Sequence, residues 1–222
     1  MNSKSLNNKP NPEENLSSGG VPFQKPIPID KEVPWDKTLT IISKTDLFGT
    51  IEYVNEVFLD VSGYEDHELI AKPHNIIRHP DMPKVVYKLM WDNIKQGNQF
   101  HGIIKNLAKS GRYYWAITSF EYSKDEKGKI TNYIDKRRSV PQDVITKHIQ
   151  PLYNKLLQIE KVSGELPSEK YLVGFLENEG VNYVDYITNI MVEMELLSNQ
   201  NNSKHTENNV EAKKGFFGRF FS

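Results

Sequence analysis

The chain has 222 residues, of which 37% are hydrophobic and 26% are charged, and its formal net charge is -1. These values suit one globular domain with appendages, and a near-neutral chain with dispersed Lys and Arg lacks the basic footprint of a nucleic-acid-binding protein. Cysteine is absent. Its absence excludes disulfides, thiolate metal sites and cysteine nucleophiles, and it fits a cytoplasmic protein.

The amino-terminal segment, residues 1–34, holds six of the 12 prolines among Asn, Ser and Gly. This composition predicts a disordered leader, because it buries too little apolar surface to offset the entropy of ordering. The leader has no apolar signal-peptide core, and the chain has no run of about 18 apolar residues that would span a bilayer. We therefore expect a cytoplasmic protein that is soluble or peripheral at the inner face of the membrane.

The next segment, residues 35–140, has the pattern of one α+β domain. Apolar residues at helical spacing predict two short helices over 55–70 and an amphipathic helix over 83–97. Alternating and β-branched runs predict strands at 38–45, 50–55, 100–108, 112–123 and 129–140. This order gives a five-stranded antiparallel sheet with short helices on one face, whose concave side has room for a ligand.

Residues 141–198 form a predicted helical extension. Apolar residues recur there at spacings of 4, 3, 4 and 3, which indicates a coiled-coil seam or a helix-packing stripe that Pro151 kinks or divides. Two later striped segments, 168–178 and 184–197, are separated by Gly180 and predict a helical hairpin that caps the sheet. The seam consists of Ile145, Ile149, Leu152, Leu156 and Ile159.

The end of the chain divides into an Asn-rich segment, predicted to be a disordered linker over 199–214, and an amphipathic tail over 215–222. The tail reads GFFGRFFS, with Lys213 and Lys214 before it and Arg219 within it. It is expected to dock in a groove of a receptor or kinase complex, to touch the membrane interface weakly, or to pack back on the helical hairpin. Its apolar side consists of Phe216, Phe217, Phe220 and Phe221.

The most polar cluster in the predicted domain is residues 74–83, HNIIRHPDMP. The spacing of its two histidines and the proline between them argue against a metal site, and it offers no nucleophile or carboxylate pair for an enzyme. Arg78, His79 and Asp81 suit an anion cradle beside the first N–H groups of the following helix. An equally good alternative is structural, with Asp81 as the helix N-cap and Arg78 as its ion-pair partner.

Trp91 lies ten residues after Asp81, near Tyr87 and Met90, on or near the helix face that turns toward the sheet. It would form an aromatic wall for a flat ligand, or it would be an ordinary core residue.

These residues closely resemble the PAS sensory domain of bacterial aerotaxis receptors and related energy-taxis proteins. The resemblance spans 34–151 and rests on N-x-x-R-H-P-D-M-P, GIIKN, YYW and YIDKRR. It implies a PAS fold that binds FAD non-covalently and reports redox state or oxygen to a chemoreceptor or chemotaxis kinase complex. It also implies contacts to FAD from Arg78, His79, Asp81 and Trp91, with Asn55 and Asn106 lining the pocket.

Three positions depart from the family pattern. Phe100 stands where relatives often have tryptophan, and Leu107 and Ala108 stand where they often have cations. No transmembrane pair, long coiled coil or kinase domain follows the predicted sensor, so we expect the signal to leave through a separate partner.

Other readings remain open. The main alternative is a cofactor-free PAS adaptor that dimerises through the domain or through the seam. A haem sensor is disfavoured because residues 83–97 contain no histidine, and a photoadduct-forming flavin domain would need a cysteine.

Overall fold

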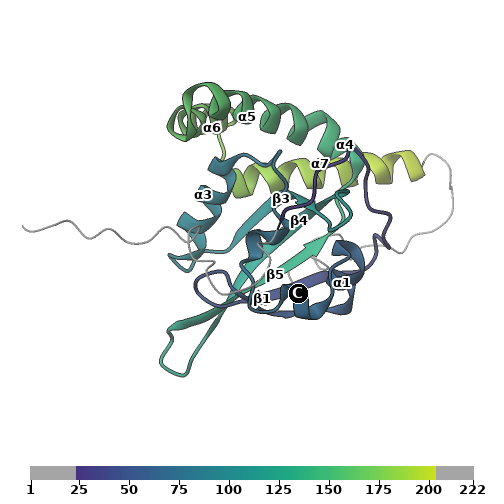
Figure 1. Cartoon of the computed structure of the whole chain (residues 1–222). Coiled ribbons are helices and arrows are strands. Elements are labelled where there is room, and N and C mark those ends of the chain that lie inside the picture. Colours follow the sequence, from purple (N-terminus) through teal and green to yellow (C-terminus); the bar gives the residue numbers. More distant parts are fainter. Residues whose placement is uncertain (1–23, 204–222) are drawn as a thin grey trace, which may run out of the picture.

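The computed structural model describes residues 24–203 of the chain, with side chains described as far as residue 197 (Figure 1). Its centre is a five-stranded antiparallel sheet in the order β2-β1-β5-β4-β3, which confirms the predicted sheet. The strands are β1 (Ile41–Thr45), β2 (Ile51–Val54), β3 (Phe100–Leu107), β4 (Tyr113–Lys124) and β5 (Ile130–Arg138).

Short helices connect β2 to β3, as predicted. The break at Gly63 is a left-handed turn with φ of 70°, where its N–H closes the first helix on the carbonyl of Leu59. The long helix ends at Ile94, three residues before the predicted stop at Gly97. These elements are α1 (Glu56–Ser62), α2 (Asp66–Leu69), the 3-10 helix η1 (His74–Ile77) and α3 (Lys84–Ile94).

The two faces of the sheet follow from strand alternation and register. Arg137 lies opposite Thr118, and its guanidinium is 5.6 Å from the ring of Phe58 in α1, so Arg137 and Thr118 point toward the short helices. We call this side the helix-covered face; it also carries Ser43, Asn106, Tyr114, Tyr133 and Asp135. The opposite face carries Ile103, Lys105, Trp115 and Ile117.

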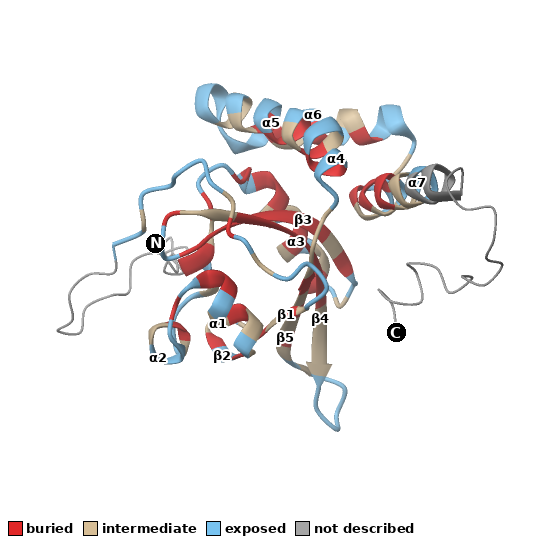
Figure 2. Ribbon diagram, turned by 90° about the vertical axis from the view of Figure 1, so that its right-hand side faces the viewer, coloured by how far each residue is buried: buried red, intermediate tan, exposed pale blue. Residues whose placement is uncertain are grey.

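The helical extension packs on the domain through the opposite face and the edge of β3. The Trp115 ring lies 6.2 Å from that of Tyr153 in α5, and the Tyr153 hydroxyl donates to the carbonyl of Ile103. Figure 2 shows α7 and α1 on different sides of the sheet. The extension comprises α4 (Gln142–Val144), the π-helix η2 (Ile145–Ile149), α5 (Gln150–Ser163), α6 (Glu165–Glu179) and α7 (Tyr183–Ser203).

One detail of the extension corrects the sequence predictions, and a second selects one of the two alternatives given for the seam. The hairpin pairs α5 with α6 across Gly164, whereas α6 and α7 make few contacts and α7 packs on β3. The predicted seam is an internal packing stripe, because Ile149 and Leu156 are fully buried in the chain's own core. Pro151 does mark a division, since it stands in the first turn of α5 directly after the π-helix.

Both edges of the sheet are held by one segment, residues 71–78, which we call the crossing segment. At one edge, Ile51 of β2 donates to the carbonyl of Lys72 and accepts from the N–H of Ala71. At the other edge, Arg78 forms a β-bridge with Asn106 of β3. The crossing segment therefore runs over the helix-covered face from β2 to β3.

The predicted leader was too long. Residues 29–33 belong to the fold, because Ile29 donates to the carbonyl of Gly111 and Val33 donates to that of Tyr113. At the other end, α7 continues to Ser203, inside the predicted linker. Residues 1–23, the remainder of the linker and the Phe-rich tail lie outside the described residues.

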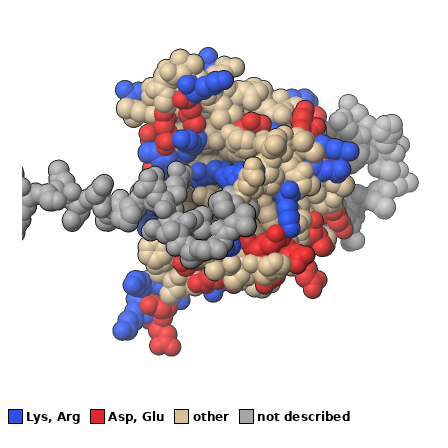
Figure 3. Space-filling view, viewed as in Figure 1, with Lys and Arg blue, Asp and Glu red and all other residues tan. Residues whose placement is uncertain are grey.

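Within the described part of the chain, no helix is both long and apolar enough to cross a membrane. On the face shown in Figure 3, acidic and basic side chains are interspersed.

Candidate functional site

A buried polar cluster lies on the helix-covered face. Arg137 Nη2 donates to Asp135 Oδ2 at 2.7 Å and to His74 Nε2 at 2.8 Å, while its Nη1 donates to Ser43 Oγ at 3.0 Å. A guanidinium only donates, so His74 Nε2 accepts and the ring proton lies on Nδ1. Burial and the charge of Arg137 hold the pKa of His74 well below its usual value. His74 is therefore neutral, and Arg137 is the cation of the cluster.

A second group of polar atoms lies near this cluster without hydrogen-bond partners. The guanidinium of Arg78 stacks 3.9 Å from the ring centroid of Tyr87 in α3. Arg78 Nε, the Tyr114 hydroxyl and Thr118 Oγ1 are buried and have no partner among the described protein atoms. Buried polar groups in folded proteins are nearly always hydrogen-bonded, so these three atoms indicate a place for a polar ligand or water.

Trp91 is half-buried on the same side of the sheet. Its ring meets the Tyr133 ring edge-on at 5.8 Å, and Lys95 Nζ lies 5.2 Å from its centroid. A Cβ on Gly49 would lie 3.6 Å from the Trp91 ring, which leaves the indole in close contact with the β1–β2 turn. Trp91 thus packs against the domain core while keeping part of its surface accessible.

The side chain of Asn55 makes three hydrogen bonds to backbone groups. Its Oδ1 accepts from the N–H groups of Ile42 and Phe58 at 3.0 Å each, and its Nδ2 donates to the Thr40 carbonyl at 2.9 Å. The side chain caps α1 and ties it to β1.

His79 and Asp81 lie on the opposite face from Arg78. The ring of His79 meets that of Tyr113 edge-on, and its Nδ1 accepts from the Asp81 N–H at 3.1 Å. Asp81 Oδ2 accepts from Lys105 Nζ at 2.8 Å. These residues border a cavity of about 370 Å³, which Trp115 also lines.

His79 is also uncharged. Burial, and secondarily Lys105, lower its pKa to about 4. The anion cradle predicted from the sequence would therefore gain no positive charge from His79 at neutral pH.

The start of α3 is capped from a distance. Glu160 of α5 accepts from the backbone N–H groups of Lys84 at 3.0 Å and Val85 at 3.1 Å. The expectation that Asp81 is the N-cap was wrong, since the cap position is Pro83 and no local side chain bonds there. Two of the N–H groups expected to face a phosphate are therefore taken by a carboxylate of the extension.

The comparison with protein families identifies this region. Residues 51–135 match the family described as PAS fold. Residues 51–135 form a PAS domain. The match begins at β2 and ends within β5, so it includes all the short helices and the crossing segment.

The PAS domain has relatives among characterised proteins. The Escherichia coli protein named aerotaxis receptor is 37% identical over 59% of this chain and 26% of its own length. The Pseudomonas aeruginosa biofilm dispersion protein BdlA is 28% identical over 37% of this chain and 20% of its own length. A light-state structure of the blue-light photoreceptor Aureochrome1 LOV has 21% identity, covers 52% of this chain and 93% of its own, and has a TM-score of 0.46. This chain therefore spans about a quarter of the aerotaxis receptor.

The residues predicted from the sequence to form one site lie on two different sides of the sheet. Arg78, Trp91 and Asn106 belong to the helix-covered face or to α3 above it, while His79 and Asp81 lie across the edge of β3. The division arises because the chain passes β3 in extended form after Arg78, so consecutive side chains point to opposite sides.

The helix-covered face has features that fit a flavin. Its unpartnered polar atoms need hydrogen bonds, Arg78 brings a donor fork suited to phosphate, and Trp91 offers partly exposed aromatic surface. For metals, the residues described in the structure contain no group of three His, Asp or Glu side chains placed to hold an ion.

Sequence reasoning missed several residues of this face. Ser43, Asp135 and Arg137 received no role, although YIDKRR was part of the quoted resemblance. The available signal was the placement of Asp135 and Arg137 two residues apart in a strand, which predicts one shared face. Tyr114 and Thr118 alternate in the same way within β4.

Proposed function

We propose that the PAS domain is a cytoplasmic sensor of redox state or oxygen. In this proposal it holds FAD non-covalently on the helix-covered face and passes its signal to a separate chemoreceptor or chemotaxis kinase complex. It has no catalytic role. FAD would supply a redox-active ring whose charge and hydrogen bonding differ between oxidation states.

One observation carries the proposal. Three buried polar atoms, on Arg78, Tyr114 and Thr118, lack protein partners on the face that the short helices cover. Leaving such atoms without hydrogen bonds costs about 1–3 kcal/mol each, and a ligand with polar edges removes that cost. The resemblance to aerotaxis PAS domains and the 37% identity to the aerotaxis receptor support FAD as that ligand.

The proposed contacts follow from placement. Arg78 would bind an anionic group of FAD through its free Nε, and Trp91 would lie against the flat ring. Asn106 would help to line the pocket, since it is buried on the same face and its Nδ2 makes only a long 3.4 Å bond to the Ile104 carbonyl.

Three residues implied by the resemblance would act indirectly. Asn55 would fix α1 against β1. His79 and Asp81 would hold the chain after Arg78 against β3 through Lys105. In this proposal they are positioning residues rather than contacts of the cofactor.

The route to the extension would begin at α3. This helix carries Tyr87 and Trp91, and its amino terminus is bound to Glu160 of α5. Lys88 also donates to Glu169 of α6 at 2.7 Å. A displacement of α3 would therefore change the position of α5 and α6 directly, without passing through the sheet.

The test is the flavin content of the purified full-length protein, expressed with flavin available. We expect flavin absorbance and release of FAD on denaturation. Arg78→Ala should weaken FAD binding roughly ten- to a hundredfold, because a charged hydrogen bond contributes about 1.5–3 kcal/mol. Trp91→Ala should also lower occupancy. Asp81→Asn should lower occupancy less than Arg78→Ala does, since Asp81 acts only as a positioning residue from the opposite face. Lys136→Ala, a solvent-accessible change on that opposite face, is the control and should retain FAD.

A colourless full-length protein that releases no FAD would refute the proposal and favour the cofactor-free adaptor. Normal occupancy in Arg78→Ala, with circular dichroism like that of the unaltered chain, would remove Arg78 from the site. Loss of FAD in Asp81→Asn alone would place the pocket on the opposite face.

A further inference from the structure

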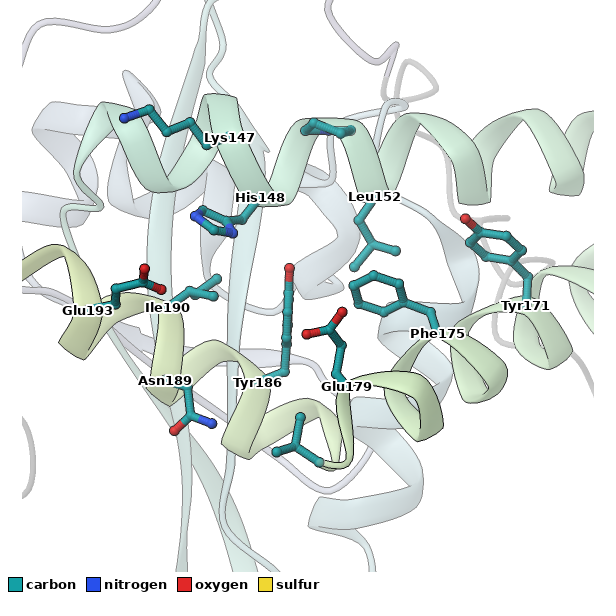
Figure 4. Close-up of a pocket in the computed structure, with 12 residues that line it drawn as sticks. Lys147, His148, Leu152, Tyr171, Phe175, Glu179, Tyr186, Asn189, Ile190 and Glu193 are labelled. Carbon is teal, nitrogen blue, oxygen red and sulfur yellow. The ribbon is translucent and has the colours of Figure 1, made fainter.

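A groove lies between the helices of the extension, away from the helix-covered face of the sheet. Figure 4 shows His148 and Leu152 pointing down from η2 and α5, toward Phe175 of α6 and Tyr186 of α7. The Phe175 and Tyr186 rings meet edge-on at 5.3 Å, and Ile190 continues the apolar wall along α7. The cavity measures about 490 Å³, which is within the range of ligand-binding clefts.

The rim of this groove is acidic. Glu179 and Glu193 line it, and neither makes an ion pair with another of the described residues. Lys147 also stands on the rim, but its charge is offset by Asp143 at 2.8 Å. The groove thus combines an aromatic interior with two carboxylates available to a cationic occupant.

We propose that this groove binds the chain's own carboxyl-terminal tail, residues 215–222. The tail supplies four phenylalanines for the apolar interior. Lys213, Lys214 and Arg219 supply cations for Glu179 and Glu193. Aromatic anchors surrounded by opposite charges are the usual composition of a peptide seated in a helical groove.

The stretch of chain between the groove and the tail is long enough for the tail to reach the groove. From Glu193 on the rim, α7 continues to Ser203, about 15 Å at 1.5 Å per residue. Residues 204–215 then lead to Phe216. Twelve residues can span at most about 40 Å, which exceeds the length of α7 beyond Glu193, so the tail can reach the groove. Tethering also gives the tail a local concentration in the millimolar range, so a weak site is filled.

If the tail docks in the chain's own groove, the groove competes with a membrane or a partner protein for the tail. A membrane or a partner protein can take the tail only by displacing it from Phe175 and Tyr186. This inference does not depend on FAD, because the groove contains no residue of the helix-covered face.

Disulfide trapping tests the inference, because the natural chain has no cysteine. The groove pair combines Asn189→Cys with Ser222→Cys in the full-length chain. The control pair combines Lys127→Cys, in the exposed β4–β5 turn that points away from the extension (Figures 1 and 2), with Ser222→Cys. Under mild oxidation we expect the groove pair to form an intramolecular disulfide at least about tenfold faster.

Two further changes to the groove pair should slow its reaction to the control rate. One replaces the four phenylalanines of the tail with serine, and the other combines Glu179→Lys with Glu193→Lys. Equal rates for the two original pairs would overturn the proposal, and sedimentation of the full chain with phosphatidylglycerol vesicles would then assign the tail to the membrane. Disulfides formed mainly between chains would overturn docking within one chain and indicate a second copy as the occupant.

Discussion

Arg137 and Lys136 are neighbours in β5, yet their side chains lie in different surroundings. Arg137 is 3% exposed and pairs with buried Asp135, whereas Lys136 is 43% exposed and pairs with Glu121 at the surface. A buried pair that loses one partner leaves a desolvated charge behind, while an exposed pair is screened by water. The two positions therefore form a matched comparison within one strand.

We expect Arg137→Ala to lower the free energy of unfolding by about 3–5 kcal/mol and Lys136→Ala to lower it by less than about 1 kcal/mol. Urea unfolding of the two variants beside the unaltered chain measures both values. Similar losses in the two variants would contradict the burial of the Arg137 cluster.

His79 makes the stability of the folded state depend on pH, and the direction of this dependence follows from its pKa shift. Its pKa falls from 6.5 in the unfolded chain to about 4 in the folded domain, so the unfolded state binds a proton more readily. The stability associated with neutral His79 is complete above pH 6.5 and is lost as pH falls toward 4.

Comparison with His79→Gln isolates this effect, since His74 is common to both proteins. We expect the stability difference between the unaltered chain and the variant to be constant above about pH 7 and to shrink between pH 6.5 and 4. Thermal or urea unfolding across this range measures it. A difference that does not change with pH would mean that His79 is not buried as described.

At the scale of elements, Glu160 joins α3 to α5. We expect Glu160→Ala to destabilise the fold by about 1 kcal/mol, the usual cost of a lost cap, and to accelerate amide exchange at Lys84 and Val85. Glu177→Ala, an exposed change in α6, is the control and should leave these amides protected. Unchanged exchange in Glu160→Ala would show that the cap is not maintained in solution.

Most elements of this chain were predictable because their signals are local. Alternation revealed the strands, and helical spacing with a glycine stop revealed α1 and α3 within a few residues. The cap of α3 was not predictable, because its donors and Glu160 are 75 and 76 residues apart and no periodicity connects them. The α5–α6 pairing was missed because stripes show that a helix packs without showing its partner.

The candidate site was predictable only in part for the same reason. Arg78 and Trp91 were found as residue types within a distinctive motif. Whether Arg78 and His79 act together depends on how residue 78 pairs with Asn106, which is set by tertiary contacts. The cluster around Arg137 needed the register between β1 and β5, which brings Ser43 opposite Asp135.

At the scale of the whole molecule, the PAS domain and the extension share one core. Ile149 and Leu156 belong to the same buried cluster as Val86 of α3 and Ile103 of β3. The extension therefore contributes to the stability of the PAS domain, and a displacement of α3 would alter packing that the domain and the extension share. This arrangement suits the proposed sensor function, in which the output would be a change in the position of α5 and α6.

The crossing segment has a consequence for self-assembly. An uncovered edge strand is a template on which other chains polymerise into fibrils. Here β2 is held at Ile51 by residues 71 and 72, and β3 is held at Asn106 by Arg78. A foreign strand could extend the sheet at these positions only after the crossing segment had detached. Protection from fibril growth and the proposed arginine contact to FAD thus depend on the same eight residues, 71–78.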